Sequence, residues 1–191
     1  MTSTTRVDRT LRRAPAARGF SLTELMVTVA IASIFMGVAA PSLTSVFRGN
    51  RIIGEASSLV SDMQFARAEA IQRGSAVSLC PSSNGTTCLT TNTWHSGWIV
   101  FNDVNGNGIF DSSVDTALRV RGAFKGTDTF VSAQGSTAIT FNREGFVSNT
   151  GAATTVLALH TSDNVSNLTR CVSINLGGRI TTLTAGQSTC T

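Results

Sequence analysis

The chain has 191 residues, of which 41% are hydrophobic and 14% charged, and a formal net charge of +4. This length suits one globular domain with an added segment and argues against a second full domain. The net charge lies in the first 18 residues, where five arginines oppose Asp8. After Gly19 ten basic residues balance ten acidic ones, so the overall basicity does not predict binding to polyanions.

A nearly uncharged segment follows this basic leader. Between Phe20 and Ala40 the only charged residue is Glu24, and the stretch after it is apolar. About 20 such residues suffice to span a bilayer, and the positive charge ahead of them predicts a cytoplasmic N-terminus. We therefore expect a transmembrane helix over 20–41, with the C-terminal part outside the cytoplasm.

Glu24 is the feature that a plain membrane anchor does not explain. An acidic side chain in lipid costs roughly 2.5–3.5 kcal/mol at a helix centre and less near its edge, so it normally has a partner. A secretory signal peptide cut after Val38-Ala39-Ala40 is an alternative. Pro41 would then occupy the first mature position, where signal peptidase works poorly. The sequence therefore favours an apolar segment in which the Glu24 carboxylate binds a partner.

The segment Arg18-Gly-Phe-Ser-Leu-Thr-Glu-Leu-Met-Val27 resembles the class III signal of type IV pilins and type II secretion pseudopilins. The resemblance implies that a prepilin peptidase cuts after Gly19 and methylates Phe20. It also implies that Glu24 pairs with the N-terminal ammonium of a neighbouring subunit as the helices bundle into a filament. Pro41 matches a position where pilin helices commonly bear a proline, so we expect a helix kink there. The implied partners are other pilins or pseudopilins, the peptidase and the inner membrane.

The helical pattern continues over 42–74 but becomes amphipathic. Apolar residues recur at spacings of three and four from Ile52 to Ala70, and polar residues such as Asp62 and Arg67 lie between them. Gly74 is placed to end the helix. We expect this half to pack one face on a globular domain.

Residues 75–191 favour a β-rich domain, since they are rich in Thr, Ser, Gly, Val and Asn. We expect strands at Ala76–Cys80, Gly97–Asn102, Ala117–Arg121, Thr129–Ser132, Ala138–Asn142, Val156–His160, Arg170–Asn175 and Arg179–Thr182. Together with the helix they predict an α+β chain of the type IV pilin-like fold, with a long N-terminal helix packed on one antiparallel sheet or two small ones. The predicted parts are the leader 1–19, the helix halves 20–41 and 42–74, and the domain 75–191.

Four cysteines, Cys80, Cys88, Cys171 and Cys190, lie in the β-rich part. None forms a C-x-x-C pair or stands at a zinc-ligand offset from a histidine, so disulfides are favoured over a metal site. Four cysteines allow three connectivities, of which the local pairs 80–88 and 171–190 need the shortest loop closures. Disulfides would place the domain in an oxidising compartment, here the periplasm.

Two further pieces narrow the resemblance. Cys80-Pro-Ser-Ser-Asn-Gly85 and Gly97-Trp-Ile-Val-Phe-Asn-Asp103 resemble the GspH/FimT family of minor pseudopilins, and they favour its FimT/FimU side. The resemblance implies a minor pilin that primes or caps a type IV pilus, with the pseudopilin H of type II secretion as the alternative. The chain would begin in the inner membrane and then enter the filament.

Asp103-Val-Asn-Gly-Asn-Gly108 is similar to the start of a calcium loop, with oxygen ligands at alternating positions. Asp103, Asn105, Asn107 and Asp111 are the candidate ligands. The twelfth position is Val114, where a bidentate Glu should stand, so turns that close a hairpin are the favoured interpretation and we expect no metal.

We expect neither an enzyme nor a cofactor, since the sequence has no G-x-S-x-G, H-E-x-x-H or P-loop. A third hypothesis, DNA capture at a pilus tip, comes from the family resemblance, which implies a Gly-Arg-x-Arg motif. Here the sequence is Gly178-Arg179-Ile180-Thr181, without the second arginine. DNA binding would then need Arg179, Arg170 and Arg143 to be gathered by the fold.

Overall fold

The computed structural model describes residues 19–149, 152–187 and 190. The chain divides into two compact units, residues 1–43 and 44–191, each described here by itself. Of the predicted leader 1–19, all but Gly19 lies outside the described residues.

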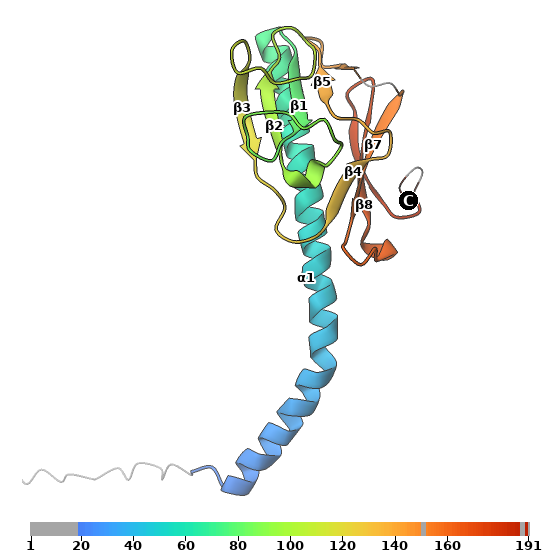
Figure 1. Ribbon diagram of the computed structural model, residues 1–191. Helices are drawn as coiled ribbons and strands as arrows, with labels where there is room; N and C mark the ends of the chain where they lie inside the picture. Colours follow the sequence, from blue (N-terminus) through green and yellow to red (C-terminus); the bar gives the residue numbers. More distant parts are fainter. Residues whose placement is uncertain (1–18, 150–151, 188–189, 191) are drawn as a thin grey trace, which may run out of the picture. The chain divides into compact units, whose positions relative to one another are not determined.

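The helix α1 spans Leu22–Arg73, 52 residues that run through both units (Figure 1). Its second half buries a stripe at spacings of three and four, formed by Ile52, Ala56, Leu59, Met63, Ala66 and Ala70. Gly74 ends the helix with a φ of 66°, and its N–H donates to the Ala70 carbonyl at 3.0 Å. The helix continues through Pro41. The side chain of Pro41 is not among those described, so the kink stays a prediction.

The first sheet has five antiparallel strands in the order β3-β2-β1-β5-β6. They are β1 (Val77–Pro81), β2 (Trp98–Asn102), β3 (Thr116–Arg121), β5 (Ile139–Phe141) and β6 (Val147–Ser148), and the short helix η1 (Trp94–Ser96) precedes β2. All five β1 residues are buried, because this strand lies in the middle of the sheet.

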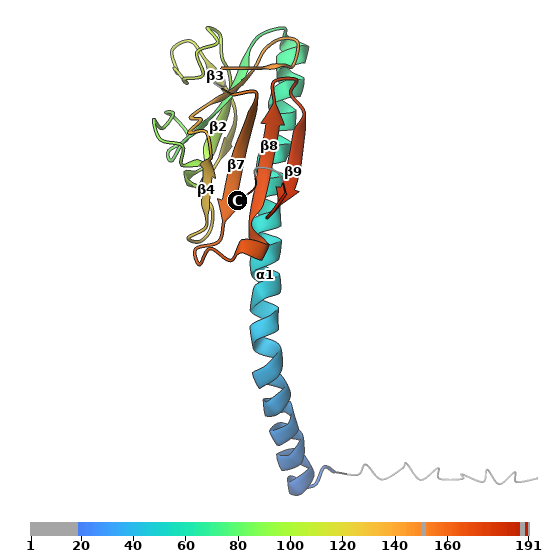
Figure 2. The ribbon, with the colours of Figure 1, turned by 90° about the vertical axis from the view of Figure 1, so that its right-hand side faces the viewer.

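The second sheet has four antiparallel strands in the order β4-β7-β8-β9. They are β4 (Thr129–Ser132), β7 (Thr154–His160), β8 (Arg170–Asn175) and β9 (Ile180–Thr184), with the short helix η2 (Ser166–Leu168) before β8. Figure 2 shows β9 beside the second half of α1, at the outer edge of this sheet.

The core of the 44–191 unit is formed by α1 and both sheets together. It joins the buried helix stripe to apolar residues of β1, β2 and β5 from one sheet and of β4, β7 and β8 from the other. Trp94, Trp98 and Phe130 are among its largest fully buried side chains. Burying one such side chain contributes roughly 1.5–3 kcal/mol, so this shared core holds the two sheets on one helix.

The predicted disulfides form, and of the three possible connectivities the structure has the local pairs Cys80–Cys88 and Cys171–Cys190. The first ties β1 to the loop after it, and the second ties residue 190 to β8. The predicted pilin-like α+β fold is confirmed as well, with two sheets against the helix. Every predicted strand overlaps an observed one, and only β6, two residues long, has no counterpart in the prediction.

Candidate functional site

The start of α1 presents the predicted processing and assembly residues. Gly19 and Phe20 are exposed just ahead of the helix, and the N–H of Leu25 donates to the Ser21 carbonyl at 3.1 Å in its first turn. Glu24 lies in that first turn, exposed, where a negative charge also suits the helix dipole. It makes no hydrogen bond or ion pair with any described residue. Its carboxylate is therefore accessible to a group from another chain.

Large apolar side chains are exposed around the whole circumference of the first half of α1. Between Leu22 and Met36 they include Leu25, Met26, Val27, Val29, Ile31, Ile34 and Phe35, each at least half exposed. A helix that is apolar on all sides needs an apolar environment. In the described part of the chain, however, no helix meets the length and apolarity required of a membrane span, so the expected span over 20–41 is not confirmed.

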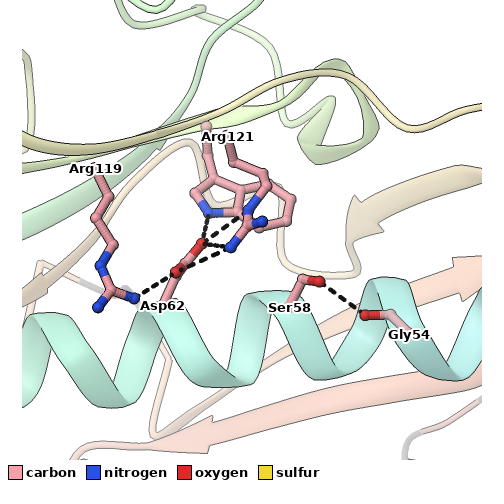
Figure 3. Close-up of polar contacts among 6 residues, drawn as sticks. Gly54, Ser58, Asp62, Arg119 and Arg121 are labelled. Carbon is pink, nitrogen blue, oxygen red and sulfur yellow. Dashed lines mark hydrogen bonds and ion pairs between the residues drawn. The ribbon is translucent and has the colours of Figure 1, made fainter.

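The buried carboxylate of Asp62, on the second half of α1, is the centre of a charged cluster (Figure 3). Its side chain is 1% exposed, and its Oδ2 accepts the indole N–H of Trp98 at 3.0 Å. The guanidiniums of Arg119 and Arg121, on β3, donate to the same carboxylate at 3.1 Å each. One carboxylate thus accepts hydrogen bonds from two guanidiniums and one indole N–H, and it fixes the edge of the first sheet on the helix.

Arg67 joins α1 to both sheets. Its Nη1 donates to the Gly178 carbonyl at 2.9 Å and its Nη2 to the Gly177 carbonyl at 3.2 Å, in the hairpin between β8 and β9. A side chain on Gly145, in the turn between β5 and β6, would come within 3.0 Å of the same guanidinium. The turns at the ends of the two sheets therefore meet at one arginine.

A third cluster surrounds Glu55. Arg51 makes a two-point ion pair with the buried Asp128, at 2.6 and 2.8 Å, and Glu55 follows one turn later on α1. Burial and then the neighbouring Asp128 raise the pKa of Glu55 to about 7, although Arg51 opposes this. Its Oε2 is buried without a hydrogen-bond partner among the described residues. The cluster borders a cavity of about 480 Å³ that is also lined by Arg121 and Lys125.

The three clusters were not predicted as sites. The helical period separates Asp62, Arg67 and Glu55 from the apolar stripe, but their partners lie far along the sequence and no local pattern reveals them. The sequence held one signal for the Asp62 cluster. Arg119 and Arg121 alternate on one predicted strand, so they lie on the same face of it and need an acidic partner such as Asp62.

The predicted DNA-binding arginines are only partly brought together. Arg179 is exposed and lines the same cavity as Arg67. Arg143 lies in the turn that packs on Arg67 and pairs with Glu144 at 3.4 Å. Arg170 is the first residue of β8, whereas the hairpin that carries Arg179 follows the last one. At 3.3 Å per residue the two ends of β8 are about 17 Å apart. The Nη1 of Arg170 donates to the Thr169 carbonyl at 2.8 Å.

The candidate calcium ligands form turns in the loop between β2 and β3. Asp103 is fully buried, and its carboxylate accepts hydrogen bonds from the Asn107 and Gly108 N–H groups and from Ser78 Oγ. Hydrogen bonds from Ser113 lower the pKa of Asp111. No group of three or more acidic, His or Cys residues in the described ranges could hold a metal ion.

A long helix with an exposed apolar first half and two antiparallel sheets on its second half define a pilin-like subunit, of the minor pilin and pseudopilin class. Residues 15–40 match the prokaryotic N-terminal methylation motif. Residues 55–178 match the family model of the Type II transport protein GspH, so the chain belongs to the GspH family. No curated protein sequence matches significantly.

Two solved crystal forms of one protein show the same fold. A crystal structure of the type IV minor pilin FimU from Pseudomonas aeruginosa covers 72% of this chain and 92% of its own, at 20% identity and a TM-score of 0.55. A second crystal form of FimU covers 70% and 94%, at 20% identity and a TM-score of 0.53. The minor pseudopilin EpsH from Vibrio cholerae covers 69% and 95%, at 13% identity and a TM-score of 0.47.

Proposed function

We propose that this chain is a minor pilin, which enters a type IV pilus through α1 and primes or caps the filament. Its role is structural rather than catalytic. The observation that carries the proposal is the first half of α1, whose large apolar side chains are exposed on all sides. Packing against the same helices of other subunits would bury this surface, while the 44–191 unit remains available to contact neighbours.

Glu24 is the residue that makes such packing selective. Cleavage between Gly19 and Phe20 by a prepilin peptidase creates an N-terminal ammonium four residues ahead of this carboxylate in each subunit. In an apolar filament core, an ammonium from a neighbouring chain offers the carboxylate a compensating charge. Before assembly the same helix would hold the precursor in the inner membrane, with the disulfide-bonded domain in the oxidising periplasm.

Replacing Glu24 by Ala tests the assembly role. The variant should be processed normally, and its amount in sheared filaments should fall at least tenfold. Because Glu24 also suits the helix dipole, a double variant that combines Thr23→Glu with Glu24→Ala keeps an acidic first turn and serves as control. It should fail to assemble as well. Filament levels of the Glu24→Ala variant equal to those of the wild type would refute the role.

The choice of a type IV pilus over type II secretion is supported by the Cys80–Gly85 and Gly97–Asp103 sequences, which favour the FimT/FimU side of the family. Deleting the chain should then reduce surface pili and twitching motility and leave type II secretion intact. Loss of secretion with normal pili would assign the chain to the secretion system instead.

DNA binding is a second candidate function, supported by Arg179 and Arg67 on one exposed cavity. Phosphate contacts are sensitive to salt, so affinity should fall steeply as salt rises. Gel shifts of the full chain in detergent, compared with Arg179→Ala, test this function. Absence of a shift even at low salt removes it.

A further inference from the structure

The outer edge of β9 is open to a further strand. Among the described residues, β9 is the last strand of its sheet and pairs with β8 alone. Its hairpin with β8 fixes which backbone groups face outward. The Asn175 N–H donates to the Arg179 carbonyl at 3.2 Å, and the Gly178 N–H donates to the Asn175 carbonyl at 2.9 Å. This is a three-residue hairpin loop with a glycine bulge, and it makes 175 and 179 a hydrogen-bonded pair.

Hydrogen-bonded pairs alternate along an antiparallel ladder, so residues 181 and 183 also face β8. The backbone groups of Ile180, Thr182 and Thr184 therefore point away from the sheet. Those of Thr184 are used, since Gln187 donates to its carbonyl and accepts its N–H. Within the described residues, the outward N–H and C=O groups of Ile180 and Thr182 have no such partner.

β9 also lacks the devices that usually protect a sheet edge. Natural edges carry charges, proline or bulges that oppose pairing with another chain. β9 reads Ile-Thr-Thr-Leu-Thr, with no charge and no proline. The edge strand β3 of the other sheet, by contrast, carries Arg119 and Arg121.

Two cavities lie between this open edge and α1, and together they are called the groove here. The cavity near Ile180 has a volume of about 480 Å³, and its helix wall includes Gln64, Ala68 and Ile71. The cavity near Thr182–Thr184 has a volume of about 160 Å³, and its helix wall includes Ile53, Ala56 and Ser57. Except for Ala56, these wall residues follow the helical period and form one stripe beside the buried one. Apart from Gln64, small and aliphatic side chains of the helix therefore border both cavities.

Both ends of the groove are basic. Arg67 and Arg179 line the end near Ile180, and Arg170 lines the end near Thr184. No acidic residue lines either cavity among the described residues. A bound segment would therefore match the groove best with a carboxylate at one or both ends and small or apolar residues between them.

The described part of the 44–191 unit offers no such segment from a second copy of this chain. Most acidic residues of the described 44–191 unit are already engaged: four are buried, and others pair with an arginine or a turn. The buried ones are Asp62, Asp103, Asp115 and Asp128, and the engaged surface ones are Glu69, Asp111, Glu144 and Asp163. The remaining Glu55 lies on a helix. None of these carboxylates lies on a strand, so the complementary strand is expected from a different protein.

We propose that the groove between α1 and β9 binds an extended segment of a different pilin-like subunit, which adds as a fifth strand beside β9 and places a carboxylate at Arg170 or at Arg67 and Arg179. Main-chain hydrogen bonds to Ile180 and Thr182 supply affinity, and the arginines select the register. This inference rests on the proposed function, since it needs a neighbouring subunit in the filament.

The test uses the full chain in cells that assemble pili. A photo-crosslinking amino acid at Gln64, on the wall of the groove, is compared with one at Thr116, on the edge of the other sheet. We expect the Gln64 probe alone to form an adduct with another subunit that carries the N-terminal methylation motif. Mass spectrometry should map the adduct to a segment that contains Asp or Glu.

Two substitutions at Thr182 then separate backbone pairing from side-chain contact. Thr182→Pro removes an outward N–H without removing a bond to β8, and it should lower the adduct yield at least tenfold. Thr182→Val keeps the N–H and should leave the yield unchanged, whereas Arg170→Glu should lower it. Formation of the Cys171–Cys190 disulfide, read on non-reducing gels, verifies that each variant folds.

Several outcomes overturn the inference: no adduct at Gln64, an adduct with a second copy or with DNA, or a Thr182→Pro yield equal to the wild-type yield. Filament content of the wild-type chain is measured in the same cells. If the chain enters filaments but forms no adduct, only this inference fails. If the chain never enters filaments, the proposed function itself fails.

Discussion

The indole N–H of Trp98 on β2 donates to Oδ2 of Asp62 on α1 at 3.0 Å, and both side chains are almost wholly buried. This contact links the helix to β2 of the first sheet. Arg119 and Arg121, both on β3, donate further hydrogen bonds to this carboxylate. The polar side of an amphipathic helix thus carries a structural centre rather than only a solvated surface.

Replacing Asp62 by Ala should therefore destabilise the chain strongly. The change leaves the indole N–H of Trp98 buried without an acceptor and removes the counter-charge of two arginines, which together cost about 2–4 kcal/mol. Asp62→Asn keeps an acceptor but not the charge, so its effect should be smaller. Urea unfolding of the full chain in detergent measures both.

Asp163→Ala is the matched control for Asp62. Its ion pair with Arg48 is about half exposed on both sides, and such pairs contribute little. We expect no measurable change in the unfolding midpoint. An equal fall of the unfolding midpoint in the Asp163 and Asp62 variants would show that the Trp98–Asp62 contact stabilises the chain no more than an exposed ion pair does.

Gly178→Ala should also destabilise the chain, for a backbone reason. Gly178 has a φ of 73°, and a Cβ there would lie 2.3 Å from the Gly145 carbonyl oxygen. The left-handed conformation alone costs about 1–2 kcal/mol for alanine, and the clash adds to it. Gly177→Ala, where the nearest atom is 3.4 Å away, should be close to neutral. Thermal unfolding of the two variants compares them, and equal midpoints would contradict the prediction.

The sequence was sufficient for features that depend on local pattern. The three-and-four spacing predicted the buried stripe from Ile52 to Ala70, and the turn residues bounded nearly every strand. Short loop closure favoured the two disulfides that form. The resemblance to the methylation motif and to the family rests on short runs of contiguous residues, namely Arg18–Val27, Cys80–Gly85 and Gly97–Asp103.

Features that depend on long-range contacts escaped the prediction. β6 has only two residues, and the N–H of Val147 donates at 2.9 Å to the carbonyl of Leu176, in the distant hairpin between β8 and β9. Arg67 finds its acceptors more than a hundred positions away. The open edge of β9 follows from the strand order, which no local periodicity encodes.

The Cys171–Cys190 disulfide should stabilise the chain by about 3 kcal/mol, because it closes a loop of 19 residues in the unfolded chain. Replacing both cysteines by Ala removes this constraint and frees residue 190 from β8. The unfolding midpoint in urea should fall accordingly, and reduction of this variant should lower it further through Cys80–Cys88. An unchanged midpoint would show that the loop after β9 is already ordered by its other contacts.

Stability should depend on pH through Glu55. Its pKa is raised from 4.5 to about 7 in the folded chain, so folding favours the protonated carboxyl. The stabilisation is complete below pH 4.5 and is lost as the pH rises through about 7. Asp128 faces this group from the loop before β4, while Arg51, Arg121 and Lys125 supply nearby positive charge.

Glu55→Gln keeps a neutral side chain at every pH, so the variant should lose less stability than the wild type between pH 5 and pH 8. We expect a difference of about 1 kcal/mol, because solvent screens a carboxyl that is only partly buried. Urea unfolding at the two pH values measures it. Glu144→Gln, at an exposed pair with Arg143, is the control and should follow the wild type. Parallel pH profiles for the wild type and Glu55→Gln would show that the carboxyl stays ionised over this range and that the unpaired Oε2 costs the folded chain nothing.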